Sequence, residues 1–144
     1  MINDITTDFE NPPQFQYIKN LRPGKNYEYP NRFKDEQQKL YPDLKALVIS
    51  RPAAECFLKT KEIISSQCPI WKHIGGDENN LSLEYVDTTK LLRFKDDVVI
   101  EFRETPESHC EIHMRSKSRV GRDDFGKNAA RINALFEILS TELN

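Results

Sequence analysis

A basic and hydroxyl-rich run near the C-terminus has the residue types that bind an anion. Arg115 and Arg119 carry forked donors that match carboxylate and phosphate groups, and Ser116 and Ser118 add hydroxyls. A glycine follows, which permits close backbone approach, and the start of a helix downstream offers free N–H groups. We therefore predict a pocket for a small anion or a lipid headgroup where the last strand meets the last helix. Its lining is expected to come from Arg115, Ser116, Ser118, Arg119, Gly121, Asp124, Asn128 and Asp97.

The same run also has a structural interpretation. Arg119 or Arg122 can pair with a nearby carboxylate and hold the last strand against the last helix. The candidate carboxylates are those of Asp96, Asp97 and Asp124. Acidic side chains at a helix start satisfy the helix dipole and repel an incoming anion, and no phosphate-loop spacing is present. Both interpretations stay open, and the acidic neighbours favour the structural one.

Two further clusters are explained more simply by turns and strands. Asp96 and Asp97 could do acid–base work or hold a cation, but neighbours on an extended chain point in opposite directions. We therefore expect a turn with ion pairs there. His109 and His113 lie about 13 Å apart if they share a strand, too far to ligate one metal ion. Cys110 falls on the apolar side, where thiols are usually inert. We predict no metal site and no cofactor.

The composition indicates one globular, water-soluble domain over residues 1–144. Lys and Arg number 21 against 23 Asp and Glu, a net charge of −2. We expect no nucleic-acid partner, because such binding needs a cationic excess. Three cysteines without metal or redox spacing fit a reducing compartment. No long apolar run or signal peptide is visible, so we expect a cytoplasmic chain that does not cross a membrane.

Residues 1–42 are expected to form an extended, proline-rich arm that lies over the core. Five of the eight prolines fall in this segment, and each removes a backbone donor. A helical turn is predicted over residues 35–41, ending before Pro42 because the residue that precedes a proline avoids the helical region. The aromatic residues expected to pack the arm on the core are Phe9, Phe15, Tyr17 and Tyr27.

Residues 43–144 carry the periodic patterns of an α+β core. Apolar residues at helical spacing predict helices over 53–67 and from 125 onward, with Lys127 and Arg131 on the outer face of the second. Strands are predicted over 46–49, 70–74, 81–85, 98–102 and 110–115, with turns between them that include residues 95–97. Short turns favour antiparallel pairing. We predict a two-layer sandwich: a mainly antiparallel sheet of four to five strands, covered on one face by two helices.

Four stretches of the sequence resemble a bacterial and plastid family catalogued as domain of unknown function 1499. They are residues 3–8 with 11–13 and Phe15, Gln37 with 41–44, Phe94 with 96–100, and residues 115–116 and 118–122 with Asp124, Gly126 and Asn128. The resemblance implies no assigned activity. Family members often carry hydrophobic segments ahead of this domain, so it also implies a possible membrane association. Family members often have arginine at the position of Glu101 and serine at that of Asp123, so this chain resembles a less basic version of the family.

Three functional hypotheses follow from these patterns. We expect a binding or interaction domain rather than an enzyme, with a small anionic ligand in the predicted pocket. The alternative is a structural scaffold for a protein or membrane partner, which requires an exposed apolar patch. The second alternative is a hydrolase-like enzyme, which requires a base within hydrogen-bond reach of a nucleophile in a cleft.

Overall fold

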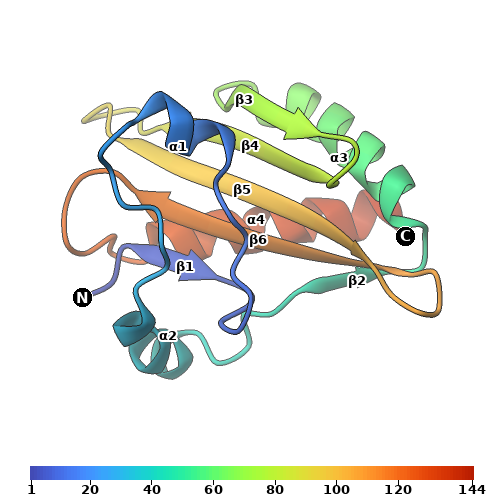
Figure 1. Ribbon diagram of the computed structural model, residues 1–144, viewed down its shortest axis with the longest axis horizontal. Helices are drawn as coiled ribbons and strands as arrows, with labels where there is room; N and C mark the ends of the chain where they lie inside the picture. Colours follow the sequence, from blue (N-terminus) through green and yellow to red (C-terminus); the bar gives the residue numbers. More distant parts are fainter.

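The computed structural model describes all 144 residues. The chain forms one β-sheet, with two helices on one face and the N-terminal arm across the other (Figure 1). The strands are β1 (Asp4–Thr6), β2 (Leu47–Ile49), β3 (Lys72–Asp77), β4 (Ser82–Thr88), β5 (Lys95–Glu104) and β6 (Cys110–Ser118). The helices are α1 (Tyr17–Leu21), α2 (Lys34–Leu40), α3 (Ala53–Gln67) and α4 (Lys127–Leu143), with a short 3-10 turn, Asn31–Phe33, before α2. The predicted α+β class is confirmed.

The sheet is antiparallel throughout, with the order β1-β6-β5-β4-β3. Strand β2 also pairs with β6, so β1 and β2 lie one after the other along the same edge, opposite residues 115–117 and 110–112 of β6. The sheet therefore has six strands, one more than the upper end of the prediction. The missing strand is β1, whose three residues are too short to show a two-residue alternation.

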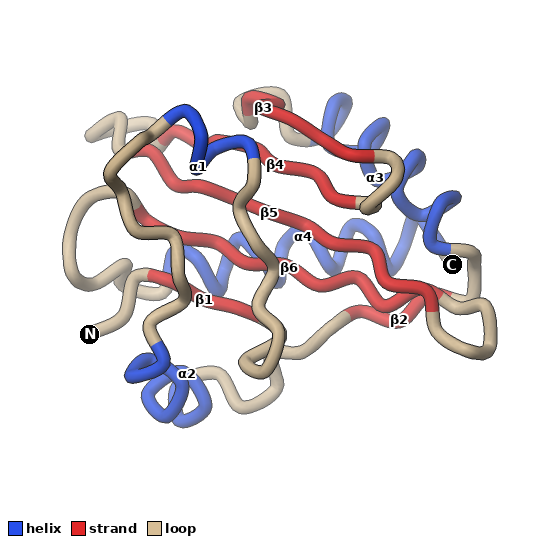
Figure 2. The backbone as a smooth tube through the Cα atoms, viewed as in Figure 1, coloured by secondary structure: helices blue, strands red, loops and turns tan.

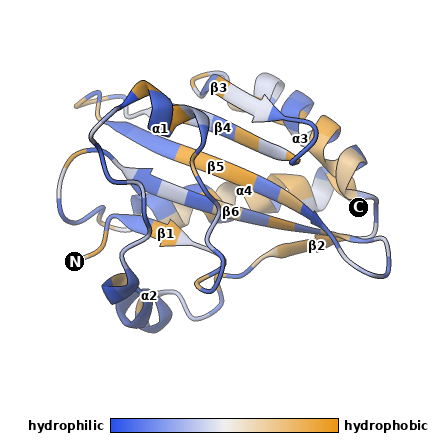
Figure 3. Cartoon of the chain, in the orientation of Figure 1, coloured by the Kyte–Doolittle hydropathy of each residue, from blue (hydrophilic) through white to orange (hydrophobic).

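Helices α3 and α4 pack on one side of the sheet, which we call the helix face (Figure 2). Val98, Ile100 and Phe102 of β5 point to this face and belong to its core of 21 buried residues. The alternation of β5 places Val99 on the opposite side, the arm face, where it belongs to a second core of five buried residues. Figure 3 shows β5 as hydrophobic in its middle and hydrophilic toward both ends.

The arm packs on the arm face because the sheet supplies a buried carboxylate for it. Glu84 of β4 is fully buried, and its carboxylate accepts the backbone N–H groups of Gln16, Tyr17 and Ile18 at 2.7, 3.0 and 2.9 Å. These donors belong to the start of α1, where a helix has no internal partners for them. One side chain of the sheet therefore fixes where the arm begins its short helix.

The structure corrects several predicted boundaries, and both β4 and β6 extend past the strands predicted over 81–85 and 110–115. Helix α3 has the predicted limits, but α4 begins at Lys127 and leaves Phe125 92% exposed. The strand predicted over 70–74 is β3 at Lys72–Asp77. Residues 95–97 are not a turn: they begin β5, and both Asp96 and Asp97 are fully buried. Aspartates are common in turns, which is why a turn was predicted here. In the structure Asp96 and Asp97 can be buried in a strand because Arg131 and Arg119, distant in sequence, neutralise them.

Candidate functional site

The alternation of β6 divides the basic run between the two faces of the sheet. Ser116 and Ser118 point to the helix face, where both side chains bond Asn128. Arg115 and Lys117 point to the arm face, where their side chains lie over the rings of Phe15 and Tyr27. The residues predicted to line one pocket therefore form two separate groups, with the sheet between them.

The helix-face group is a closed polar network centred on Arg131. Its guanidinium bonds Asp87 at 2.9 Å through Nε and Asp96 at 2.7 Å through Nη2. Nη1 donates to Ser116 Oγ at 3.0 Å and to Asn128 Oδ1 at 2.8 Å. The side chain of Arg131 is only 7% exposed, so the prediction that it lies on the outer face of α4 is wrong. The apolar pattern of α4 did not predict this burial, because Arg131 lies at the edge of the apolar stripe.

Asn128 connects the last helix to the end of β6 within the same network. Its Nδ2 donates to Ser118 Oγ at 2.9 Å and to Asp124 Oδ2 at 2.8 Å. Asp124 also accepts the N–H of Gly126 at 2.8 Å, so its carboxylate organises the start of α4. Ser116, Ser118, Asp124 and Asn128 thus bind one another and connect the last helix to the last strand.

One buried acceptor in this network has no partner within the chain. Asp96 is fully buried, and its Oδ2 accepts from Arg131 and lies 3.1 Å from Lys127 Nζ. Its Oδ1 has no hydrogen-bond partner. A buried carboxylate oxygen normally finds a donor, so Asp96 Oδ1 is the unsatisfied acceptor of this network.

The arm-face group is built on a buried ion pair between Arg115 and Asp4. The two side chains are 2% and 0% exposed, and Nε and Nη2 of Arg115 bond the two carboxylate oxygens at 2.9 and 2.8 Å. Arg115 also donates to the carbonyl oxygens of Pro13 and Tyr27 at 3.2 and 2.9 Å. Four hydrogen bonds engage four of its five N–H groups. One residue of β6 therefore holds three separate parts of the arm.

Asp97 forms a second buried group on the arm face, beside Arg115 but not in contact with it. It accepts a hydrogen bond from the Tyr27 hydroxyl at 2.6 Å and another from Arg119 Nε at 2.8 Å. Arg22 Nη1 lies 3.6 Å from the same carboxylate. Burial, together with the neighbouring Asp97 carboxylate, raises the pKa of Tyr27 to about 12. Arg119 is thus engaged by an internal carboxylate.

The loop between β6 and α4 packs on the first residues of the chain. Asn3 Nδ2 donates to the carbonyl oxygen of Gly121 at 2.7 Å, and the N–H of Asp124 donates to Ile2 at 3.0 Å. Gly121 has φ +90°, a left-handed conformation that glycine adopts without steric cost. The glycine predicted to approach a ligand therefore approaches the N-terminal segment.

Two adjoining pockets lie along the arm face, and together we call them the arm groove. The first has a volume of about 580 Å³ and has Arg115 among its lining residues, with the aromatic rings of Phe9, Phe15, Tyr27 and Tyr29. The second has a volume of about 680 Å³ and is lined in part by Lys117 and Arg122. Both share Asn26 and Glu28. The alternation of β6 thus directs cations of the basic run into a groove that the sequence did not reveal.

The arm groove has an excess of positive charge. Its cations that form no salt bridge with any carboxylate of the chain are Lys19, Lys25, Arg32, Lys117 and Arg122. Of its two acidic side chains, Glu10 pairs with Lys34 at 3.4 Å, and Glu28 has no basic partner. Five unpaired cations against one unpaired carboxylate make this the part of the arm face most suited to an anion.

The histidines and cysteines predicted not to bind metal form no cluster of three or more possible ligands. His113 is held on the arm face, with Nδ1 3.1 Å from Thr7 Oγ1 and Nε2 3.2 Å from Glu111 Oε1. A hydroxyl, an imidazole and a carboxylate in series resemble a catalytic arrangement. However, Thr7 Oγ1 also accepts the N–H of Met114 at 3.0 Å, and none of the three side chains lines the arm groove.

Glu101, at a position where the family resemblance implies arginine, is not among the residues that line the arm groove. Its carboxylate bonds Arg103 at 2.8 Å and accepts the N–H of Gln14 at 3.0 Å. Arg103 also binds Asp8 at 2.6 Å. The glutamate therefore holds the arm to β5 and is itself paired with Arg103.

The comparison with family models gives a match over nearly the whole chain. The model described as "Protein of unknown function (DUF1499)" matches residues 4–139. The chain belongs to this family. No curated protein matches it. In this DUF1499 chain no helix is both long and apolar enough to span a bilayer.

Proposed function

We propose that this DUF1499 chain is a non-enzymatic binding domain that takes a small anionic ligand in the arm groove. The observation that carries the proposal is the set of five unpaired cations around two adjoining pockets. A phosphate or carboxylate group gains charge-assisted hydrogen bonds from such side chains. The junction of β6 and α4, where we first placed the site, is less suited because its polar groups bind one another.

The aromatic wall of the first pocket favours a ligand that carries a ring or an apolar group beside its charge. The rings of Phe15 and Tyr27 lie 5.2 Å apart between centroids, and Arg115 lies 4.9 Å from the ring of Phe15. Aromatic faces add stacking to charge recognition. An aromatic phosphate therefore matches the arm groove better than inorganic phosphate does. Three free cysteines fit a reducing compartment, and we propose a cytoplasmic location for this ligand binding.

The test uses phenyl phosphate and inorganic phosphate as probes in a two-dimensional NMR titration of the amide groups. We expect phenyl phosphate to bind more tightly and to shift the signals of Asn26 and of Lys117 and its neighbours. Replacement of both Lys25 and Lys117 with glutamate is expected to weaken binding by about tenfold for each lost charge-assisted bond.

The matched control is Lys45→Glu, which reverses one exposed lysine outside the arm groove. It is expected to bind both probes like the unmodified chain. Absence of any titration shift, or equal weakening in the control, would overturn the proposal.

A further inference from the structure

Apolar side chains are exposed together at the end of the sheet where β4 turns into β5. In the loop between these strands, Leu91 is 89% exposed, Leu92 64% and Phe94 37%. Val120, in the loop that leaves β6, is 53% exposed. Both loops lie at the left end of Figure 1. Exposed leucines on a loop contribute nothing to the core and indicate a surface that contacts an apolar partner.

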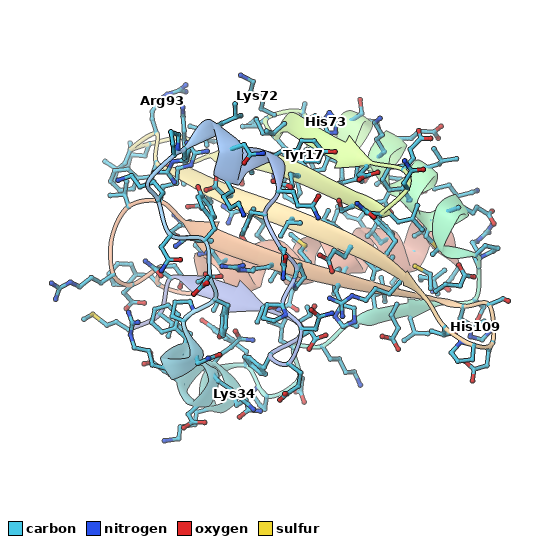
Figure 4. All side chains as sticks on the ribbon, viewed as in Figure 1. Tyr17, Lys34, Lys72, His73, Arg93 and His109 are labelled. Carbon is cyan, nitrogen blue, oxygen red and sulfur yellow. The ribbon has the colours of Figure 1, made fainter.

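The same loop is locally basic although the whole chain is acidic. Lys90, Arg93 and Lys95 are exposed and alternate with the apolar residues, and residues 88–95 contain no acidic side chain. The carboxylates that flank the loop, Asp87 and Asp96, are both bound by Arg131. Arg93 projects away from the sheet at this end of the molecule (Figure 4). The loop therefore carries three unpaired cations on a chain of net charge −2.

The backbone of the loop is closed on itself. The N–H of Thr89 donates to the carbonyl oxygen of Phe94 at 2.8 Å, and the N–H of Phe94 donates to Thr89 Oγ1 at 2.9 Å. Arg93 has φ +57°, a left-handed conformation in the turn. Backbone polar groups that enter an apolar medium need a hydrogen-bond partner. The N–H groups of Thr89 and Phe94, at the base of this loop, already have one.

We infer that the loop of residues 88–95, which we call the β4–β5 tip, docks on the surface of an anionic lipid bilayer. Leu91, Leu92 and Phe94 enter the boundary between headgroups and acyl chains, while the cations meet lipid phosphates and carboxylates. Interleaved lysine and leucine distinguish this surface from the core of a protein interface, which is depleted in charged residues and especially in lysine. The cytoplasmic leaflet, which is anionic, is the bilayer surface that matches this charge.

The test is cosedimentation of the whole chain with phosphatidylcholine vesicles, with and without phosphatidylserine, at low and high salt. Binding is expected only to the vesicles with phosphatidylserine and is expected to weaken at high salt. The double variant Lys90→Glu with Arg93→Glu should lose about fivefold in partitioning for each cation removed. Leu91→Ser with Leu92→Ser should lose about a hundredfold.

The matched control is Leu58→Ser, which changes a leucine that is 53% exposed on α3 and is expected to leave partitioning unchanged. All variants must retain the thermal unfolding midpoint and the phenyl phosphate binding of the unmodified chain, which separates this surface from the arm groove. Equal binding to neutral vesicles, no binding to either kind, or unchanged partitioning of both tip variants would each overturn the inference. So would a dimer in sedimentation equilibrium that dissociates when Leu91 and Leu92 are replaced, because a second copy would then cover the tip.

Discussion

Replacement of Arg115 with methionine provides the most direct test of how the arm is held. The substitution keeps an unbranched side chain but leaves the fully buried Asp4 carboxylate without its partner. Removing one member of a buried ion pair costs about 3–5 kcal/mol, because an uncompensated charge stays in a medium of low polarity. The carbonyl oxygens of Pro13 and Tyr27 also lose a donor, at about 1 kcal/mol each. The expected loss is a large part of a typical total stability of about 5–15 kcal/mol.

The assay is a double-mutant cycle in urea, followed by the fluorescence of the single tryptophan. Trp71 packs against Tyr85 at 5.8 Å on the helix face, so it reports unfolding without contacting the replaced side chains. Arg115→Met and Asp4→Asn alone should each be strongly destabilising. The double variant removes both charges, so its loss should fall short of the sum by about 2 kcal/mol or more.

Arg103→Met is the matched control, because it removes a similar pair at a more exposed position. Arg103 and Asp8 are bonded at 2.6 Å but are 26% and 20% exposed, and pairs in contact with water contribute about 1 kcal/mol or less. The reasoning is refuted if Arg115→Met costs no more than Arg103→Met. It is also refuted if the losses of Arg115→Met and Asp4→Asn add to within about 0.5 kcal/mol in the double variant.

Three further outcomes are expected. Arg131→Met should lower the urea unfolding free energy by about 3 kcal/mol, since the buried Asp96 keeps only Lys127 and Asp87 loses its cation. Arg131→Lys should restore part of this loss, and a loss below that of Arg103→Met would contradict the prediction. Gly75→Ala should lower the free energy of unfolding by about 1–3 kcal/mol, because the new Cβ would lie 2.5 Å from the ring of Tyr17. An unchanged thermal unfolding midpoint would contradict this steric clash. Burial and the Arg103 charge lower the pKa of His113, so below about pH 6.5 the unfolded chain binds more protons than the folded chain. The free energy of unfolding should therefore fall as the pH drops, by at most about 1.4 kcal/mol per pH unit. In urea titrations at several pH values, His113→Gln should reduce this slope.

The periodic elements of the core could be predicted because their own residues encode them. The apolar residues of α3 recur at helical spacing, and the helix has the predicted limits. The alternation of β5 and β6 could likewise be recognised from Val98 and Ile112 and their neighbours. These patterns depend only on the geometry of one element against one apolar surface.

The arm could not be predicted in the same way, because its structure depends on partners far along the chain. Strand β1 forms against β6, and α1 begins where Glu84 supplies acceptors. Neither segment has a periodic pattern of its own. The aromatic residues Phe15 and Tyr27 did indicate that the arm packs on the core, and both are buried.

The basic run shows where the sequence alone stops being sufficient. Its composition determined that Arg115, Ser116 and their neighbours form polar contacts at the end of a strand, and that Asp96 and Asp97 are near partners for the cations. Only the tertiary structure decided which contacts form, because the pleat of β6 sends alternate residues to opposite faces. The serines bind Asn128 beneath α4, while Arg115 holds Asp4 under the arm. Burial then makes each pairing obligatory, since a charged group removed from water needs an opposite charge beside it.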